Sequence, residues 1–245
     1  MTPFLHRDDI VIFDDVLDSS DREALWTYVQ MTDYQLLHLK GWHKDWRLHD
    51  GMPRAASPVS VRRDGAHPSD STHFPTHTPI DLPIQSVLQS LEQVPFVDES
   101  NWQSFKATTF LYPQGSGLSW HTDNPEHYAG SFIYYAHHEW NVEWGGELMI
   151  QELPQEGVES LYAGSVMEVK REQGEIVSAK RTHILPHLDN RNQNKVLMRQ
   201  GRGEFFYPVP NRLIFLRAGV PHRVTAVTPA AGMQPRISVS GFFQL

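Results

Sequence analysis

The stretch KATTFLYPQGSGLSWHTDNPEHYAGSFIYYA, residues 106–136, contains the clearest structural signal in this chain of 245 residues. KATTFLY (106–112) and GSFIYYA (130–136) are rich in β-branched and aromatic residues, which favour strands. PQGSG (113–117) combines Pro and Gly, residues that are typical of a tight turn. We therefore predict that β structure begins here.

The same pattern continues to the C-terminus as short apolar segments separated by Gly and Pro. Besides the two segments above, we expect strands at 147–151, 165–170, 176–179, 211–216, 223–227 and 236–243. About eight strands with turns between them indicate a sandwich or a jelly roll. Residues 152–206 are polar and contain two sharp turns, and we expect an insertion there.

The N-terminal part predicts two helices and a long loop. Ser19 or Ser20 can cap a helix over REALWTYVQ, and LPIQSVLQSLEQV (82–94) has apolar residues at helical spacing. Residues 40–80 are irregular, which favours a loop of the kind that often forms a lid. We expect one domain over residues 1–245, with helices and loop in 1–104 and the β core in 105–245.

The composition excludes several function classes. The chain has 21 basic and 29 acidic residues, a formal charge of −8 and no cysteine. A thiolate nucleophile and cysteine-ligated metals are therefore excluded, and any metal must bind to His, Asp or Glu. The acidic balance argues against a nucleic-acid partner, and no apolar run is long enough to span a membrane. We expect a cytoplasmic protein, and its oligomeric state is not indicated.

Three His-x-Asp pairs are candidate metal ligands, because side chains at i and i+2 of an extended segment share a face. They are His6/Asp8, His121/Asp123 and His187/Asp189. The first pair lies in a terminus that is expected to fray, and the last lies in a polar run without a strand pattern. The middle pair lies between a strand with its turn and the next strand, and we expect the metal there.

A third ligand has to come from another strand, and His222 follows NRLIFL and the turn RAGVP. Two histidines and one carboxylate leave three positions open on an octahedral metal, which suits non-haem Fe(II) and O2 chemistry. Arg236 and Ser238 follow on one face of a strand, and they offer the donors that anchor a distal carboxylate. A surface ion pair is the alternative for Arg236, but Ile237 and Val239 alternate with it as core residues would.

The segments LYPQGSGLSWHTDNP, FIYYAHHEWNVEWGGELMI, NRLIFLRAGVPHRV and RISVSGFF resemble the prolyl-4-hydroxylase-like group of Fe(II)/2-oxoglutarate dioxygenases. The resemblance implies a mainly β fold with flanking helices and a double-stranded β-helix core, which is a cupin-like jelly roll. It implies that His121, Asp123 and His222 are iron ligands and that Arg236 binds the C5 carboxylate of 2-oxoglutarate. Tyr112 would point into the site and Tyr135 would bind the cosubstrate, with packing in the core as the alternative for both tyrosines.

The resemblance implies an enzyme that uses Fe(II), 2-oxoglutarate and O2 to oxidise an unactivated C–H bond. We expect a small-molecule substrate, and with Asp123 present hydroxylation is the default outcome, with release of succinate and CO2. A peptidyl prolyl hydroxylase and a catalytically silent binding protein are the alternatives. Residues 42–63 form a hypothetical mobile lid over the iron, unless Trp42 and Trp46 pack against the barrel. The insertion at 152–206 is the competing source of substrate contacts.

Overall fold

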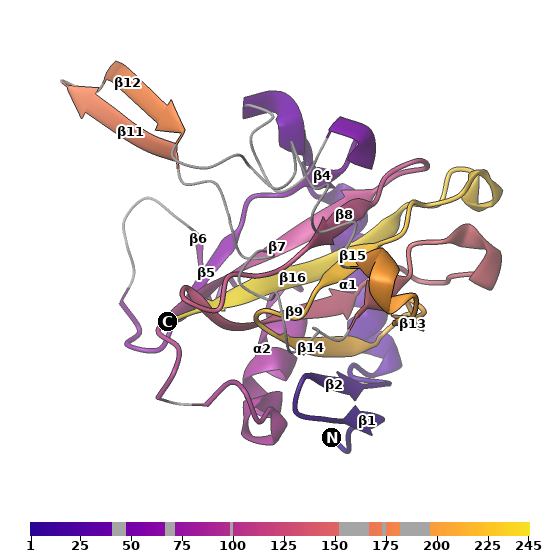
Figure 1. Ribbon diagram of the computed structural model, residues 1–245. Coiled ribbons are helices and arrows are strands. Elements are labelled where there is room, and N and C mark those ends of the chain that lie inside the picture. The colour runs from indigo at the N-terminus through magenta and orange to yellow at the C-terminus, as the bar shows by residue number, and fades with distance from the viewer. Residues whose placement is uncertain (41–47, 67–71, 99, 152–166, 173–174, 182–196) are drawn as a thin grey trace.

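The computed structural model describes residues 1–40, 48–66, 72–98, 100–151, 167–172, 175–181 and 197–245 (Figure 1). Two sheets form its centre. The large sheet runs in the order β1-β2-β14-β9-β16-β7-β4-β3, with β5 beside β7 and β6 beside β5, and the small sheet runs β13-β10-β15-β8. This is the double-stranded β-helix that the resemblance implied.

The bounds of the strands follow from the register of each pair. In the large sheet they are β1 (Leu5–His6), β2 (Ile10–Phe13), β3 (Gln35–Leu36), β4 (Arg54–Ala55), β5 (Val59–Arg62), β6 (Thr72–His73), β7 (Ser104–Tyr112), β9 (Tyr128–Tyr135), β14 (Leu213–Arg217) and β16 (Arg236–Gln244). In the small sheet they are β8 (Leu118–His121), β10 (Leu148–Ile150), β13 (Glu204–Phe206) and β15 (His222–Val224). A separate hairpin joins β11 (Met167–Glu172) to β12 (Glu175–Arg181).

Two α-helices, α1 (Ser19–Met31) and α2 (Asp81–Ser90), cover one face of the large sheet (Figure 1). Side chains alternate along β14, so that Leu213 and Phe215 pack with these helices while Ile214 and Leu216 face the small sheet. The inner face of the large sheet thus forms one wall of the space between the sheets. Short 3-10 helices are η1 (Leu37–Lys40), η2 (Leu48–Asp50), η3 (Leu91–Gln93), η4 (Val142–Trp144) and η6 (Pro229–Ala231).

Each of the eight strands predicted from the sequence overlaps a strand of the structure, whereas β1 to β6, β8 and β13 were not predicted. The cap of α1 is Asp18, whose carboxylate accepts from the N–H of Asp21, rather than Ser19 or Ser20. The second helix ends its α-helical part at Ser90 and continues as η3. Residues 48–66 and 72–80 are not simply a loop, because β4 and β5 both pair with β7. β4 has two residues, too few to show an alternation, whereas Val59 and Val61 of β5 do alternate with polar residues, a signal that the prediction missed.

The segment between β10 and β13 corresponds to the predicted insertion. Leu148 pairs with Phe206 and Ile150 pairs with Glu204, so residues 204–206 belong to the small sheet. The intervening segment is therefore 151–203. The hairpin of β11 and β12 lies within it.

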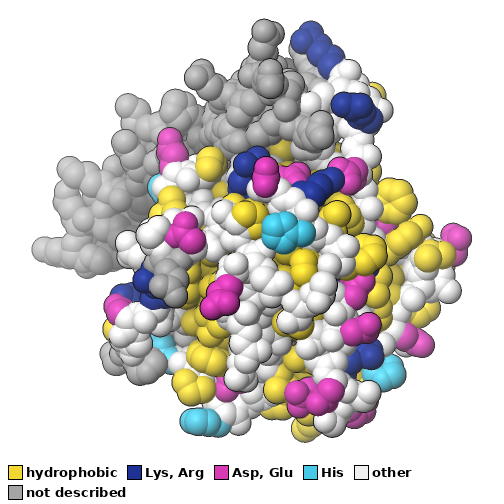
Figure 2. Space-filling model, turned by 90° about the horizontal axis from the view of Figure 1, so that it is seen from below, with side chains coloured by type: hydrophobic (Ala, Val, Ile, Leu, Met, Phe, Trp, Pro, Cys, Tyr) yellow, Lys and Arg dark blue, Asp and Glu magenta, His cyan; other side chains and the backbone are white. Residues whose placement is uncertain are grey.

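On the face of the molecule seen from below, acidic side chains are scattered over the described part of the surface, where basic side chains form no continuous patch (Figure 2). No helix in the described ranges combines the length and the apolar character that crossing a bilayer requires.

Candidate metal centre

The three residues expected to bind the metal come from the ends of two paired strands. β8 ends at His121, β15 begins at His222, and these two residues are direct partners in the register. Asp123 follows β8, and its backbone carbonyl accepts a 2.8 Å hydrogen bond from the N–H of Gly219 in the turn before β15. One ligand atom from each of the three residues lies within 4.8 Å of the other two, and within the described ranges this is the one such cluster.

The metal-facing atoms converge on one point. Nε2 of His121 is 3.9 Å from Oδ1 of Asp123, and Nε2 of His222 is 3.9 Å from its Oδ2. The two imidazole rings lie 4.1 Å apart between centroids. Since His222 and Asp123 are buried and His121 is half-buried, the cluster is open to solvent mainly at His121.

Each of the three side chains forms a hydrogen bond with a neighbouring residue. Nδ1 of His121 lies 2.9 Å from the carbonyl oxygen of Ser119, and Nδ1 of His222 lies 2.8 Å from that of Val220. A carbonyl can only accept, so each Nδ1 carries the proton and each Nε2 presents its lone pair. The hydroxyl of Ser131 donates to Oδ2 of Asp123 over 2.9 Å.

The protonation state of the cluster suits a metal ion. Burial, together with the proximity of His121, lowers the pKa of His222 to about 4, against the opposing effect of Asp123. The imidazole is therefore neutral at physiological pH, which is the form that binds metals. Two neutral imidazole nitrogens and one carboxylate are the donor set of the non-haem Fe(II) facial triad, so these residues fit the expected ion.

Arg236 lies in the space between the sheets and is 1% exposed. Its Nε donates to the carbonyl oxygen of Gly146 over 3.0 Å, and its guanidinium carbon lies 5.2 Å from the Tyr112 ring and 4.8 Å from the Tyr135 ring. Nη2 of Arg236 and the hydroxyl of Tyr135 are both buried without a hydrogen-bond partner. Buried polar groups of this kind are expected to have an acceptor or donor in the working protein.

The residues around Arg236 are the ones predicted from the sequence. Ser238 lies two residues along β16, with its hydroxyl 3.5 Å from Nη1 of Arg236. Tyr112 is directly opposite Arg236 in the register, and Tyr135 is opposite Ser238. Ile237 and Val239 pack on the helix side of the sheet, as their alternation predicted.

Gly146 makes room for the side chain of Arg236. It adopts φ +76°, and a Cβ at this position would lie 2.8 Å from Cδ of Arg236. Any side chain here would therefore displace the arginine. The carbonyl oxygen of the neighbouring Gly145 accepts a 2.8 Å hydrogen bond from Trp140 Nε1.

Two residues of the site were missed by sequence reasoning. Ser131 holds the Asp123 carboxylate, and Gly146 accommodates Arg236. For Ser131 a signal existed, because Ser131, Ile133 and Tyr135 alternate along one strand and so share its inner face. For Gly146 no local signal could identify the arginine, which lies 90 residues away in sequence.

The His6/Asp8 pair does not join the cluster. Nε2 of His6 lies 3.0 Å from the carbonyl oxygen of Gln93, and His6 belongs to β1, which pairs with β2 rather than fraying. His187 and Asp189 lie outside the described residues, as do Trp42 and Trp46.

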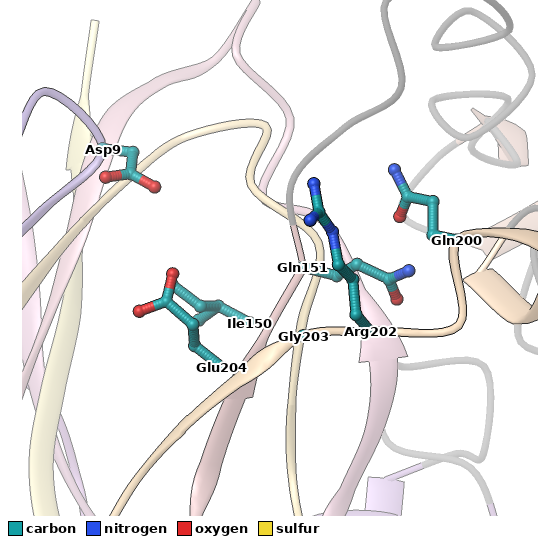
Figure 3. Close-up of a pocket in the computed structure, with 7 residues that line it drawn as sticks. All are labelled: Asp9, Ile150, Gln151, Gln200, Arg202, Gly203 and Glu204. Carbon is teal, nitrogen blue, oxygen red and sulfur yellow. The ribbon is translucent and has the colours of Figure 1, made fainter.

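A pocket of about 670 Å³ lies one strand away from the metal cluster. Its wall includes Ile150, the direct strand partner of His222, and Gln151, whose N–H donates to the carbonyl of Pro221 over 3.0 Å. Figure 3 shows the carboxylates of Asp9 and Glu204 on one side of this pocket and polar side chains on the other. Those polar side chains are Gln151, Gln200 and Arg202.

Comparison with known families gives one match: the model of the 2OG-Fe(II) oxygenase superfamily matches residues 107–244. No curated protein matches the sequence closely enough to count as a relative.

Solved structures with the same fold include a Pseudomonas putida prolyl-4-hydroxylase, at 14% identity and a TM-score of 0.54, with 97% of this chain and 93% of that chain covered. A prolyl hydroxylase from Trichoplax adhaerens, in complex with a hypoxia inducible factor peptide fragment, matches at 13% identity and a TM-score of 0.53, with 97% of this chain and 84% of that chain covered. HygX from Streptomyces hygroscopicus, with nickel, 2-oxoglutarate and hygromycin B bound, matches at 12% identity and a TM-score of 0.53, with 96% of this chain and 82% of that chain covered. At these identities the likeness shows the fold alone.

Proposed function

This chain belongs to the 2OG-Fe(II) oxygenase superfamily, and on that basis we propose that it hydroxylates an unactivated C–H bond of a small molecule, releasing succinate and CO2. It is an oxidoreductase whose cofactor is Fe(II) and whose cosubstrate is 2-oxoglutarate. The proposal extends to a single domain over residues 1–245, to a cytoplasmic location, and to a lack of nucleic-acid and membrane partners.

His121, Asp123 and His222 would hold the iron through Nε2, a carboxylate oxygen and Nε2. When bound, Fe(II) and 2-oxoglutarate together supply the activation of O2 that oxidises the substrate. The protein contributes orientation, because the carbonyls of Ser119 and Val220 keep both imidazoles in the tautomer that a metal needs.

Arg236 would bind the C5 carboxylate of 2-oxoglutarate. A guanidinium pairs with a carboxylate through two parallel N–H groups, and Nη2 of Arg236 is a buried donor that lacks an acceptor. Tyr135 would donate its unpartnered hydroxyl to the same molecule, and Ser238 would add a third donor. Tyr112 would form the wall against which the arginine stacks.

The pocket that includes Ile150 and Gln151 is the observation that favours a small-molecule substrate. Its volume of about 670 Å³ falls within the usual range for small-molecule sites. Its polar wall would orient a substrate through hydrogen bonds, and its wall residue Ile150 pairs with the candidate ligand His222 in the small sheet. The described fold is equally that of enzymes that act on peptides, so the pocket and not the fold supports this choice.

Two measurements test the proposal. Anaerobic titration with Fe(II) and 2-oxoglutarate is expected to give a weak visible charge-transfer band, whose absence in folded protein would favour a silent binding protein. A screen of succinate release over amino acids, sugars, pathway intermediates and proline-containing peptides is then expected to give turnover with a small molecule. Turnover with the peptides alone would instead establish a peptidyl prolyl hydroxylase.

A further inference from the structure

Arg223 shares one structural feature with Arg236, a buried side-chain nitrogen without a hydrogen-bond partner. Within the described residues, these are the two arginines that have a buried side-chain nitrogen without a hydrogen-bond partner: Nη2 of Arg236 and Nε of Arg223. A buried N–H without an acceptor destabilises a fold. At Arg236 the 2-oxoglutarate carboxylate accounts for it, and no such group has been assigned to Arg223.

The two arginines face different spaces. Arg223 lies on β15 between His222 and Val224, both of which are buried, so its side chain points to the opposite, outer face of the small sheet. Its strand partner there is Met149. A ligand of Arg223 would thus occupy a site on the other side of the small sheet from the space that holds Arg236.

Arg223 lines a pocket of about 300 Å³ together with His49, Asp50, Ser119 and Trp120. The pocket forms where η2 lies along β8, held by a 3.0 Å hydrogen bond from the N–H of Gly117 to the carbonyl oxygen of Asp50. Ser119 is two residues from His121, and Arg223 is next to His222. The pocket therefore shares both of its strands with the metal cluster.

The polar groups on the η2 side of this pocket are already paired with one another, which leaves Arg223 as the group without an acceptor. The Asp50 side chain is only 5% exposed and accepts a short hydrogen bond from the Ser119 hydroxyl, so its negative charge is withdrawn from the opening. The Ser119 oxygen lies 2.9 Å from Nε2 of His49. Because the Ser119 hydroxyl donates its proton to Asp50, its oxygen accepts from Nε2–H of His49. The His49 ring stands at the opening, with 70% of the side chain exposed.

We propose that this pocket binds an oxyanion group, carboxylate or phosphate, of a small organic molecule, through the guanidinium of Arg223. The arginine fork matches both groups in geometry, and its buried Nε would gain the acceptor that it lacks. The residues that line this site differ from those that line the larger pocket. Its ligand is either an anionic part of the substrate or an effector that is not oxidised.

The test uses the full chain loaded with zinc in place of iron and saturated with 2-oxoglutarate, so that the interior arginine is occupied and no turnover occurs. Phenyl phosphate and benzoate are the probes. We expect a saturable shift of the Arg223 Nε–H signal in proton–nitrogen spectra, assigned by its loss in Arg223→Gln. Calorimetry is expected to show binding weakened by about tenfold or more in Arg223→Gln, and by a smaller factor in Arg223→Lys, which keeps the charge but lacks the fork.

Arg54→Gln is the matched control, since it removes an equal charge from an exposed position on β4. It should bind the probes as the unmodified protein does. The proposal is wrong if the unmodified protein gives no saturable shift, or if Arg223→Gln, still binding 2-oxoglutarate normally, also binds the probes normally. Equal weakening in Arg54→Gln would likewise reject it, as an effect of net charge.

A second arm identifies the source of the ligand. Compounds that carry a carboxylate or phosphate and bind in an Arg223-dependent manner are incubated with the iron enzyme, 2-oxoglutarate and O2. Appearance of an oxygenated product marks the anion as part of the substrate, and unchanged compound marks it as an effector. Both outcomes support the site, and neither depends on which molecule the larger pocket binds.

Discussion

At the metal cluster, a hydrogen bond with a neighbouring residue restrains each candidate ligand side chain. The imidazoles donate from Nδ1 to the carbonyls of Ser119 and Val220, and the Asp123 carboxylate accepts from Ser131. Such neighbours lock the rotamer of a ligand before the metal arrives, which lowers the entropy lost on binding. The chemistry therefore depends on residues that never touch the iron.

Replacing any one ligand should abolish turnover. His121→Ala, Asp123→Ala and His222→Ala each leave two donors in a site that needs three. We expect iron content and succinate release to fall together. His127→Ala, which removes an exposed histidine, is the control and should retain both. Near-normal turnover in one of the three variants would show that its residue is not a ligand.

Ser131→Ala should weaken iron binding without abolishing it. Loss of the hydroxyl frees one oxygen of the Asp123 carboxylate, and changes of this type usually cost about 10- to 100-fold in metal affinity. Anaerobic Fe(II) titration measures this. Ser90→Ala removes a buried hydroxyl from α2 and should leave the affinity unchanged. An equal loss in both variants would indicate a general effect on stability.

Arg236→Ala should raise the requirement for 2-oxoglutarate and leave iron binding largely intact. Loss of a desolvated charge pair costs about 2 to 5 kcal/mol, which is about 30-fold to several thousand-fold in affinity. The KM for 2-oxoglutarate and the iron content are measured side by side, with the exposed Arg62→Ala as control. An unchanged KM would remove Arg236 from the cosubstrate site.

At the scale of elements, the site is built where β9 and β16 meet. β16 lies between β9 and β7 in the large sheet, so the side chains of Tyr135, Ser238 and Tyr112 converge from three adjacent strands. His137, just after β9, ties this corner together: its Nε2 lies 2.7 Å from the carbonyl oxygen of Pro208, and its Nδ1 lies 3.4 Å from the N–H nitrogen of Ile237. The start of β16, which carries Arg236, is thereby held.

His137 should make stability depend on pH. Burial, with smaller effects of Arg236 and Arg22, lowers its pKa to about 4, whereas the unfolded chain has the ordinary value near 6.5. As the pH falls from 6.5 towards 4, the unfolded chain takes up a proton that the folded chain does not, so stability is lost. Above 6.5 the contribution is present in full.

Denaturant titrations at pH 7 and pH 5 measure this effect against His137→Gln, which does not titrate. We expect the free energy of unfolding of the unmodified protein to fall by about 1 to 2 kcal/mol more than that of the variant. The comparison cancels the carboxylates that the two proteins share. Equal falls would mean that His137 takes up its proton in the folded state as well.

At the scale of the whole molecule, two segments were expected to compete for substrate contacts. In the first, residues 48–63 are tied to the barrel: β4 and β5 pair with β7, and Met52 N–H donates to the Ser116 hydroxyl over 2.9 Å. This pairing argues against a mobile lid over residues 48–63, whereas Trp42 and Trp46 lie outside the described residues. The second segment, 151–203, begins and ends in the pocket beside His222.

Limited trypsin digestion should distinguish the two segments. Arg199 and Arg202 are exposed next to the larger pocket, so we expect a substrate to slow cleavage there when iron and an oxoglutarate analogue are present. Cleavage after Arg54 and Arg62, which lie in paired strands, should be slow in every state. Substrate protection confined to residues 48–63 would contradict this assignment and restore the lid.

The sequence by itself determined the features that depend on local pattern. Strand alternation located the core strands and placed Arg236 and Ser238 on the face opposite Ile237, and the His-x-Asp spacing identified His121 and Asp123. These inferences hold because the side chains of one strand alternate whatever the strand packs against. The family resemblance then gave His222 and Arg236, which the strand pattern had already suggested, their specific roles, and the structure brought the predicted residues together.

Only the tertiary structure decided which distant residues complete each site. Gly146 lies against Arg236, and Asp50 lies against Ser119 69 residues along the chain. Nothing in the local sequence around either residue indicates its partner, because such contacts arise when the sheets close and bring remote turns together. The same closure turns Arg223 to the outer face of the small sheet, where its buried Nε lacks an acceptor. Alternation specifies the face of a strand, but what covers that face depends on the packing of the whole chain.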